Sequence, residues 1–427
     1  MSEGHEVTRR PPKVAMIVSR FPKVTNTFML REMIALEKLG VPIELFALVH
    51  EQEGAVHEEA RDLDSRAHYL ALKSWEVIRA QFTWLRRNRR AYLECWRWGL
   101  VTNRQAPDFF LRTFFIVPMA AAMALRMEKL GIEHVHAHFT TYPTHAALVI
   151  KTLTGLPFSC TGHTHDVQLR RDGLRDKLSE AEFFFVCTHF IADELRELYG
   201  DEIRDKCRVV YHGIDIESFP RQPLPEDDGE RPFRIVCVAS FEEHKGHTFL
   251  IDAAARLRDR GVPVEITLIG GFVALAGDVR GRIEAQVQEL GLTDQVQFLG
   301  KQPMSVVREW LAWSDIGVLA CCIGPFGQSD GIPNFLTECL CTGRPVVSTQ
   351  MDGVKELVTD GEQGLLVRTR DAAALADAIE RLRNDPELRR RMSDAARALV
   401  EAEHDVIVNT QELFDVYVEQ SGRPVGR

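Results

Sequence analysis

The sequence predicts an α/β protein made of two doubly wound parallel sheets in tandem, because short apolar strands alternate with helices along both halves of the chain. The strand "KVAMIV" at 13–18 is followed by "FMLREMIALEKLG", whose apolar residues recur at helical spacing and which ends at Gly40. A second strand, "PIELFALV", follows at 42–49. This order is typical of a parallel sheet with crossover helices. A chain of 427 residues is long enough for two such domains.

The first domain is expected to span residues 1–218. Its later strands are predicted at 132–139, 157–163, 183–189 and 207–213. The apolar stretch from Thr113 to Leu125 is shorter than the roughly 20 residues that a membrane span needs, and Pro118 interrupts it. We therefore expect this stretch to form a buried helix.

A proline-rich and acidic segment, "FPRQPLPEDDGERP" at 219–232, has no periodicity and is predicted to be a linker. The second domain, residues 233–403, begins a new strand-helix series, with strands expected at 233–240, 264–270, 296–300, 316–321, 345–349 and 364–367. Residues 404–427 are expected to form a helix that packs back toward the first domain. Ligands of such sheets bind beyond the carboxyl ends of the strands, and we expect the two sheets to face a shared cleft.

Composition excludes several classes of protein. An apolar fraction of 45% and a charged fraction of 27% are those of a folded globular protein, and a net charge of −10 argues against nucleic acid as a partner. The nine cysteines lack metal-type spacing, and the start of the chain lacks the apolar core of a signal peptide. A cytoplasmic location is the expectation.

Two acids stand eight positions apart in "GQSDGIPNFLTECL". Asp330 precedes a turn after the strand at 316–321, and Glu338 follows on a predicted helix that begins near Gly331 or Ile332, with Pro333 in its first turn. Free N–H groups at a helix start can hold phosphate oxygens. Carboxylates accept hydrogen bonds from paired hydroxyls. The pattern fits a ligand with a phosphate between two hydroxyl-bearing groups.

These residues resemble a known family. "DGIPNFLTE" is similar to the acid-x7-acid motif of family 4 retaining glycosyltransferases of the GT-B fold, in which two Rossmann-like domains face a central cleft. The resemblance continues in "VASFEEHKGHTFLIDAAARL", "VVYHGIDIESF" and "EHVHAHF". The opening "IVSRFPKVTNTFMLREMIALEKLG" looks most like the branch that builds exopolysaccharides of the colanic-acid type.

The resemblance implies roles for the donor side. Glu338 would bind the ribose of a nucleotide sugar and Asp330 its hexose hydroxyls, while Lys245 would stabilise the leaving diphosphate. The family usually has an arginine where this chain has Ser240. Backbone N–H groups at 331–334 would meet the diphosphate, and the expected donor-binding set is Ser240, Lys245, Gly270, Asp330, Gly331, Ile332, Pro333, Asn334 and Glu338.

The acceptor side is rich in histidine. The motif "HVHAHF" would place three histidines on one face of a strand, which fits packing but also a metal site. A metal-dependent hydrolase is therefore an alternative. His163 follows the strand at 157–163 and matches the family's acceptor-side histidine, with Asp166 three residues on. Imidazole can bond a sugar hydroxyl near neutral pH.

The first βα loop, "SRFPKVTNTF", lacks a glycine-rich turn. Thr25, Asn26 or Thr27 could cap the following helix or contact phosphate, and Arg20 could supply a cation. These four residues and Asp166 make up the expected acceptor or phosphate side.

Residues 73–97 are basic and aromatic in an acidic chain. They hold seven basic residues, Lys73, Arg79, Arg86, Arg87, Arg89, Arg90 and Arg97, interleaved with tryptophans at 75, 84 and 96, and a fourth tryptophan follows at 98. Such a helix fits either the surface of an anionic bilayer, where a lipid-linked acceptor is found, or ordinary domain surface.

Together these features favour a hexosyltransferase that moves a sugar, with retention, from a nucleotide sugar to a glycan or lipid-linked saccharide, with catalytic residues His163, Lys245 and Asp330. No metal or cofactor is expected. The alternatives are the metal hydrolase and a nucleotide-sugar-binding protein without turnover. The location is expected to be cytoplasmic, with peripheral attachment to the inner face of the cytoplasmic membrane as an option.

Overall fold

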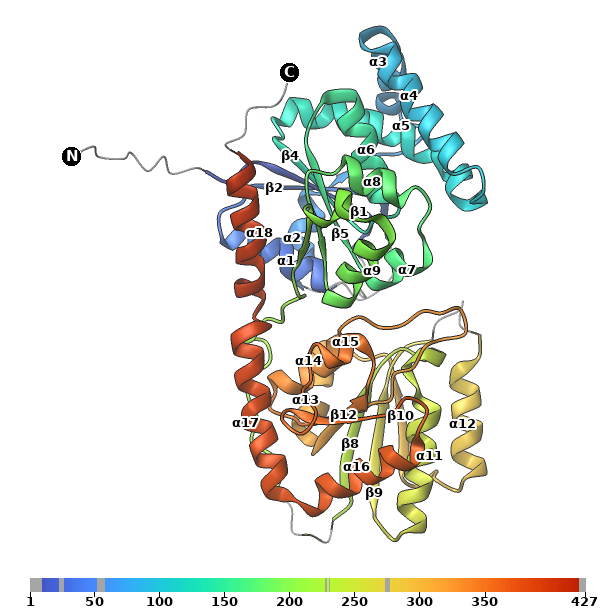
Figure 1. Ribbon diagram of the computed structural model, residues 1–427, viewed down its shortest axis with the longest axis vertical. Helices are drawn as coiled ribbons and strands as arrows, with labels where there is room; N and C mark the ends of the chain where they lie inside the picture. Colours follow the sequence, from blue (N-terminus) through green and yellow to red (C-terminus); the bar gives the residue numbers. More distant parts are fainter. Residues whose placement is uncertain are drawn as a thin grey trace, which may run out of the picture. The chain divides into compact units, whose positions relative to one another are not determined.

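The computed structural model describes residues 10–22, 27–51, 58–226, 229, 231–272 and 277–421 (Figure 1). The chain divides into two compact units. Unit 1 comprises residues 1–213 together with 406–427, and unit 2 comprises residues 214–405. These divisions lie within a few residues of the boundaries at 218 and 404 that the sequence suggests.

Unit 1 is built on a parallel sheet with the strand order β3-β2-β1-β4-β5-β6-β7. Because β1 lies between β2 and β4, the chain reverses its direction of winding beside β1, where ligand sites of such sheets form. The strands are β1 (Val14–Phe21), β2 (Ile43–His50), β3 (His68–Tyr69), β4 (His134–His138), β5 (Phe158–Gly162), β6 (Phe184–Val186) and β7 (Cys207–Val209).

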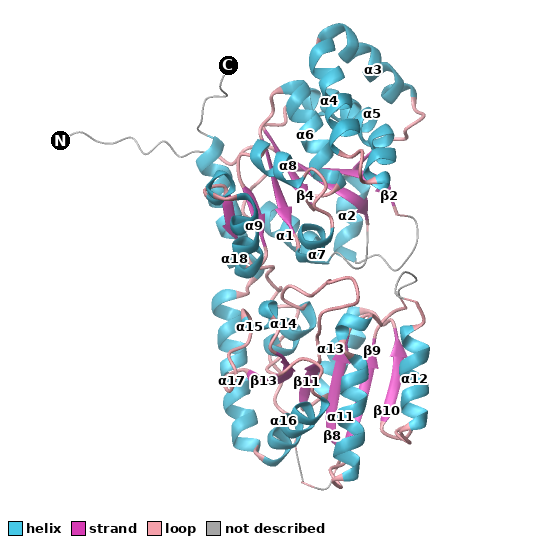
Figure 2. Cartoon of the chain, turned by 45° about the vertical axis from the view of Figure 1, so that its right-hand side comes forward, coloured by secondary structure: helices cyan, strands magenta, loops and turns pink. Residues whose placement is uncertain are grey.

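Helices cover both faces of this sheet (Figure 2). They are α1 (Thr27–Lys38), α2 (Glu58–Arg66), α6 (Tyr142–Thr154), α7 (Thr164–Leu169), α8 (Leu174–Glu180), α9 (His189–Tyr199), α10 (Asp201–Arg204) and α18 (Val406–Ser421). The last of these packs against α1, and the buried Tyr417 ring lies 5.4 Å from the His134 ring. The end of the chain is therefore part of the core of unit 1.

Three further helices of unit 1 pack on one another, α3 (Trp75–Arg87), α4 (Arg89–Thr102) and α5 (Pro107–Leu130) (Figure 1). Among the described residues, α5 is the one helix whose length and apolar composition would suffice to cross a membrane. Eleven of its residues are buried, including Ile116, Val117 and Met127. It is thus a core helix, as the sequence predicts, although it is longer than the apolar stretch alone.

Unit 2 holds a second parallel sheet, with the order β10-β9-β8-β11-β12-β13. Its strands are β8 (Phe233–Val238), β9 (Val264–Ile269), β10 (Val296–Gly300), β11 (Ile316–Leu319), β12 (Val346–Thr349) and β13 (Gly364–Val367). Its helices are η1 (Glu243–Lys245), α11 (His247–Asp259), α12 (Val279–Glu289), α13 (Met304–Trp313), α14 (Asn334–Cys341), α15 (Asp352–Lys355), α16 (Ala372–Asn384) and α17 (Pro386–Glu403). The predicted class, two doubly wound parallel sheets, is confirmed.

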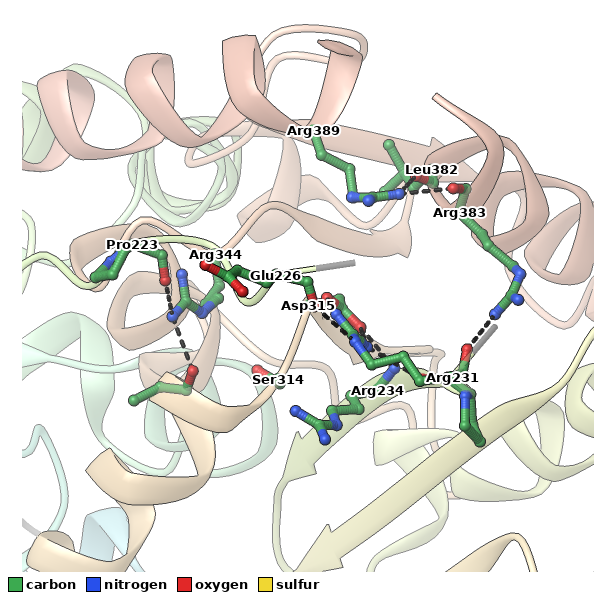
Figure 3. Close-up of polar contacts among 12 residues, drawn as sticks. Pro223, Glu226, Arg231, Arg234, Ser314, Asp315, Arg344, Leu382, Arg383 and Arg389 are labelled. Carbon is green, nitrogen blue, oxygen red and sulfur yellow. Dashed lines mark hydrogen bonds and ion pairs between the residues drawn. The ribbon is translucent and has the colours of Figure 1, made fainter. Parts of the chain in front are cut away.

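A network of arginines fixes the amino ends of the strands of unit 2 (Figure 3). Arg344 is fully buried and donates to the carbonyls of Leu311 and Pro223, each at 2.8 Å. Arg231 forms two bonds of 2.7 Å with the carboxylate of Asp315. These bonds tie the predicted linker to the sheet at the end opposite to the candidate site.

Candidate active site

The loop that follows β8 is packed directly on the end of β11. Gly246 has φ +68°, and a Cβ atom there would lie 1.8 Å from the carbonyl oxygen of Ala320. The N–H of Cys322 donates to the carbonyl of His244 at 2.9 Å. Only glycine allows this approach, because any side chain would push the two loops apart. The result is that Lys245 is held over the loop that carries Asp330.

Lys245 and Asp330 form an ion pair, with 2.5 Å between Nζ and Oδ1. Their side chains are 16% and 15% exposed. The His244 imidazole lies 3.6 Å from the same carboxylate oxygen, and the Cys321 thiol donates to the other at 3.4 Å. Burial alone would raise the pKa of Asp330, but the Lys245 charge and the His244 contact hold it well below its usual range.

The same contact stabilises the charged form of the lysine. Burial disfavours the Lys245 ammonium, yet the charge and hydrogen bond of Asp330, together with Cys321 and Glu242, outweigh that effect, so the pKa of Lys245 is raised. Both groups are therefore charged throughout the physiological pH range. At the carboxyl edge of one sheet, the cation can bind a phosphate group and the anion can accept hydrogen bonds from hydroxyl groups of the same ligand.

The helix after Asp330 begins later than the sequence suggests. Helix α14 starts at Asn334 rather than near Gly331 or Ile332, and Pro333 is its N-cap residue with ψ 121°. Because the backbone of Pro333 is extended, the residues before it cannot belong to the helix, and α14 begins at Asn334. Glu338 is buried, at 5% exposure, a little more than one turn into α14 instead of two.

A second glycine supports the turn before α14. A Cβ atom on Gly353, in α15, would lie 2.1 Å from the carbonyl oxygen of Gly331. The backbones of the two segments therefore touch. Because Gly331 directly follows Asp330, Gly353 helps to fix the position of the carboxylate.

Two other predicted donor residues lie at the ends of β8 and β9. The Ser240 hydroxyl donates to the carboxylate of Glu242 at 2.5 Å. A Cβ atom on Gly270 would lie 1.8 Å from the carbonyl oxygen of Ala239. Ser240 thus bonds an acid of its own loop, and Gly270 is required by close backbone packing.

In unit 1, His163 lies among aromatic rings at the end of β5. Its ring centroid is 4.4 Å from that of Phe139, 4.9 Å from that of Phe28 and 5.0 Å from that of His212. Burial and the neighbouring histidines lower the pKa of His163 well below 6.5, so the ring is neutral. Nδ1 lies 3.7 Å from the Asp166 carboxylate, and both ring nitrogens are buried without a hydrogen-bonded side chain among the described residues.

Asp166 links the loops that follow β4 and β5 through hydrogen bonds to both. One carboxylate oxygen accepts from the N–H of His163 at 2.7 Å, and the other accepts from the N–H and hydroxyl of Thr140. Burial raises the pKa of Asp166 to about 6, although these hydrogen bonds oppose the rise. We conclude that Asp166 positions the backbone around His163.

The first loop of unit 1 is only partly described. Arg20 is exposed and lies 3.5 Å from the carboxylate of Glu51. Thr25 and Asn26 lie outside the described residues, and Thr27 begins α1. The structure therefore places Arg20 at the end of β1, where it lines the same cavity as Asp166.

The histidines of β4 lie in the interior. Both ring nitrogens of His136 bond hydroxyls, that of Ser159 at 2.8 Å and that of Thr161 at 3.0 Å. His138 lies 3.1 Å from Glu32. Glu32, His136 and His138 are close enough together to be considered as metal ligands. Because both nitrogens of His136 already have partners, the arrangement fits packing better than a metal site.

The basic and aromatic segment forms two helices, not one. Asn88 ends α3 and caps α4. Trp84 points inward and donates to the carbonyl of Ala121 at 2.8 Å, and Trp98 bonds Asp176 at 3.0 Å. Trp84 and Trp98 therefore pack on neighbouring segments of unit 1.

A different set of apolar residues is exposed on α3. We call it the α3 stripe: Trp75, Ile78, Phe82 and Leu85, which are 69%, 39%, 61% and 38% exposed. The spacing of three, four and three residues places them on one face of the helix. The opposite face is buried through Val77, Ala80 and Trp84.

Solved structures identify the fold. A glycosyltransferase from Rickettsia africae superposes with a TM-score of 0.70 at 16% identity, covering 97% of this chain and 100% of that one. HepE of Anabaena, solved in complex with UDP, gives a TM-score of 0.69 at 16% identity, covering 95% and 100%. The fold is therefore GT-B, with two Rossmann-like domains.

The sequence identifies the family. Residues 26–218 match the model described as Glycosyltransferase Family 4, and residues 219–399 match Glycosyl transferases group 1. The putative colanic acid biosynthesis glycosyltransferase WcaL of Salmonella typhimurium is 31% identical over 391 residues, 85% of this chain and 89% of that protein. The amylovoran biosynthesis glycosyltransferase AmsK of Erwinia amylovora is 31% identical over 212 residues. The chain therefore belongs to the glycosyltransferase family that these two models and WcaL represent.

Coverage differs among these relatives. The match spans about half of AmsK and 42% of WcaL from Escherichia coli, which is 32% identical over the 176 residues compared. The findings support the glycosyltransferase prediction and give no support to a metal hydrolase or a binding protein. The resemblance to the exopolysaccharide branch is confirmed.

Proposed function

We propose that the protein transfers a hexose from a nucleotide sugar to a glycan or lipid-linked saccharide in polysaccharide biosynthesis, with retention of configuration and without a metal ion. The observation that carries this proposal is the Lys245–Asp330 ion pair, held at the carboxyl edge of unit 2 beside the start of α14. The family match supplies the class of reaction.

Each donor residue has a chemical task in this proposal. Glu338 binds the ribose hydroxyls and Asp330 the hexose hydroxyls, and N–H groups at the start of α14 bind the diphosphate. The bond between the anomeric carbon and the phosphate oxygen breaks, and the charge that grows on the leaving diphosphate is stabilised by Lys245.

The acceptor completes the reaction on the same face of the sugar. Its hydroxyl oxygen forms the new bond on the face from which the phosphate leaves, and its proton passes to a leaving-group oxygen. The neutral His163 ring hydrogen-bonds a sugar hydroxyl during this step. Ser240, bonded to Glu242, leaves Lys245 as the principal cation of this loop.

Relatives suggest where to begin the search for the donor. HepE is solved with UDP and with UDP-glucose, so UDP sugars are the first donors to test. The names of WcaL and AmsK refer to exopolysaccharides, which suggests an acceptor that carries a growing glycan.

Incubation with UDP, GDP and ADP sugars, with and without EDTA, tests the proposal. We expect release of one nucleoside diphosphate that depends on an acceptor and is unaffected by EDTA, and proton NMR should show the donor's anomeric configuration in the product. Loss of turnover on chelation would contradict metal independence. An inverted product would contradict retention, and donor binding without release would favour a binding protein.

We also propose that unit 1 attaches peripherally to an anionic membrane through α3. The α3 stripe supplies exposed aromatic and aliphatic side chains, and Lys73, Arg79 and Arg86 supply positive charge beside it in a chain of net charge −10. Attachment there would bring the enzyme to a lipid-linked acceptor at the inner face of the cytoplasmic membrane.

A further inference from the structure

Unit 1 has a cavity of about 420 Å³ at the carboxyl edge of its sheet. The ends of β1 and β2, the residues that follow β4 and β5, and α5 all contribute to its walls. Arg20, Arg112 and Arg170 line it, together with the hydroxyl-bearing residues Ser19, Thr141 and Tyr142. We call this cavity the arginine pocket.

The positive charge of the arginine pocket is only weakly balanced. Arg20 approaches Glu51 at 3.5 Å, and Arg170 approaches Asp108, whose side chain is 67% exposed, at 3.3 Å. Within the described part of the chain, Arg112 has no carboxylate partner. Exposed pairs of this kind contribute little, so the arginines remain available to another anion.

The one acid that lines the pocket does not compensate for them. Both oxygens of Asp166 already accept hydrogen bonds, from Thr140 and from the N–H of His163. Behind Asp166 lies the fully buried Lys177, whose ammonium donates to the carbonyl of Thr140 at 3.1 Å. The Asp166 charge is thus opposed by a lysine of its own, and among the described residues the three arginines face only the partly exposed acids Glu51 and Asp108.

Two of the arginines are held in position by one tyrosine. The Arg112 guanidinium lies over the Tyr142 ring, 4.6 Å from its centroid. Arg170 approaches the Tyr142 hydroxyl at 3.4 Å and lies over the Phe109 ring at 4.8 Å. Guanidinium groups that are already oriented bind a planar carboxylate or a phosphate with less loss of side-chain entropy.

The arginine pocket is also next to the predicted acceptor histidine. Phe139 lines the pocket, and its ring centroid lies 4.4 Å from that of His163. We propose that the arginine pocket binds a carboxylate or phosphate group of the acceptor, so that the enzyme selects an anionic saccharide. This inference rests on the proposed transfer reaction and adds the charge class of its acceptor.

Ligand-observed NMR with the full-length protein tests this assignment, using glucuronic acid, glucose 1-phosphate and neutral glucose as probes. Saturating UDP is included to occupy the proposed nucleotide site. We expect at least one anionic probe to bind ten times more tightly than glucose, and Arg112→Gln to remove most of that preference. Because glucuronic acid carries only a carboxylate and glucose 1-phosphate only a phosphate, the tighter probe identifies the group.

Arg61→Gln is the matched control, because Arg61 is an exposed arginine of unit 1 on α2, outside the pocket. Its binding of the three probes should equal that of the wild type. Equal affinity for all three probes, or an unchanged preference in Arg112→Gln, would overturn the inference. Titration of UDP, GDP and ADP into the same samples distinguishes the two failures. Normal binding of one nucleotide without anion preference rejects the pocket alone, whereas absent binding of all three rejects the proposed function.

Discussion

The two units share one fold class but differ in how they use charge. Unit 2 places a cation and an anion in direct contact at its carboxyl edge, where both pKa shifts favour the charged forms. Unit 1 buries neutral histidines in its interior and lines its carboxyl edge with arginines. The difference fits the proposed roles of the two units. Unit 2 breaks a glycosyl phosphate bond, which needs fixed charge, and unit 1 binds a saccharide, which needs hydrogen bonds.

The largest difference expected between the two units is the loss of folding stability as the pH falls. In unit 1, burial lowers the pKa of His134 and His145 to about 3 and of His212 to about 4, and the pKa values of His136 and His163 are also lowered. Groups with lowered folded-state pKa values contribute stability above about pH 6.5 and lose it as the pH falls toward those values. Between pH 7 and 5.5 each histidine should cost unit 1 about 1 kcal/mol.

Two features moderate this prediction. Asp166 acts in the opposite direction, because its raised pKa adds stability as the pH falls through about 6. Unit 2 has lowered pKa values at His247, about 3, and His404, about 4, and Asp330 loses its contribution only below about pH 4. Hydrogen exchange of the full chain at pH 7 and 5.5 should show unit 1 opening first. Earlier opening of unit 2 would contradict this account.

Removal of the cation tests the charge chemistry of unit 2. Lys245→Ala should lower kcat by about 10² to 10³, the range for loss of one group that stabilises transition-state charge. It should also destabilise the fold, because Asp330 would be left partly buried without its partner. The double variant Lys245→Ala with Asp330→Asn should recover the lost stability but not the rate. Normal kcat in the single variant would remove Lys245 from the reaction.

The α3 stripe offers a test in unit 1 that leaves unit 2 untouched. Arg79→Gln with Arg86→Gln should weaken binding to anionic vesicles by about 2 kcal/mol, and salt should mimic this effect. Trp75→Gln with Phe82→Gln should weaken it as well, whereas the exposed Leu198→Gln on α9 should not. Turnover with a soluble acceptor should stay normal in all of them. Wild-type protein that ignores anionic vesicles at low salt would show that α3 is ordinary surface.

A smaller effect is expected from the glycine contact behind Asp330. Gly353→Ala would place a methyl group against the backbone of Gly331, which typically costs about 1 to 3 kcal/mol. We expect a lower melting temperature and weaker donor binding by calorimetry. The neighbouring Asp352→Ala is the control, since the Asp352 side chain is exposed and pairs with Lys355 on the surface. Equal effects of the two substitutions would show that the contact does not position Asp330.

Much of the fold could be predicted because parallel strands are short apolar runs separated by clear helical and turn signals. The same logic placed Lys245 and Asp330 in loops at the carboxyl edge. Their contact could not be predicted, since it joins residues 85 positions apart and depends on Gly246 meeting Ala320. His244 was missed although it precedes Lys245 directly.

Side-chain direction on helices was harder to predict. The segment that forms α3 and α4 is clearly basic and aromatic, but Asn88 divides it into two helices. Packing on α5 then turns Trp84 inward and leaves Phe82 exposed. The arginine pocket had no spacing signal at all, because Arg112 and Arg170 come from separate segments that only the fold brings together. Gly353 also had no sequence signal, because its role is visible only from its contact with the backbone of Gly331.

Calorimetric titration of the nucleotide sugar into paired variants tests the central claim, that unit 2 carries the donor site. Glu338→Ala should weaken donor binding by about 1.5 to 3 kcal/mol, the range for hydrogen bonds to a charged group, which is roughly 10- to 150-fold. Arg112→Gln in unit 1 should bind the donor with wild-type affinity. Unchanged affinity in a folded Glu338→Ala, or a large loss in Arg112→Gln, would contradict the account.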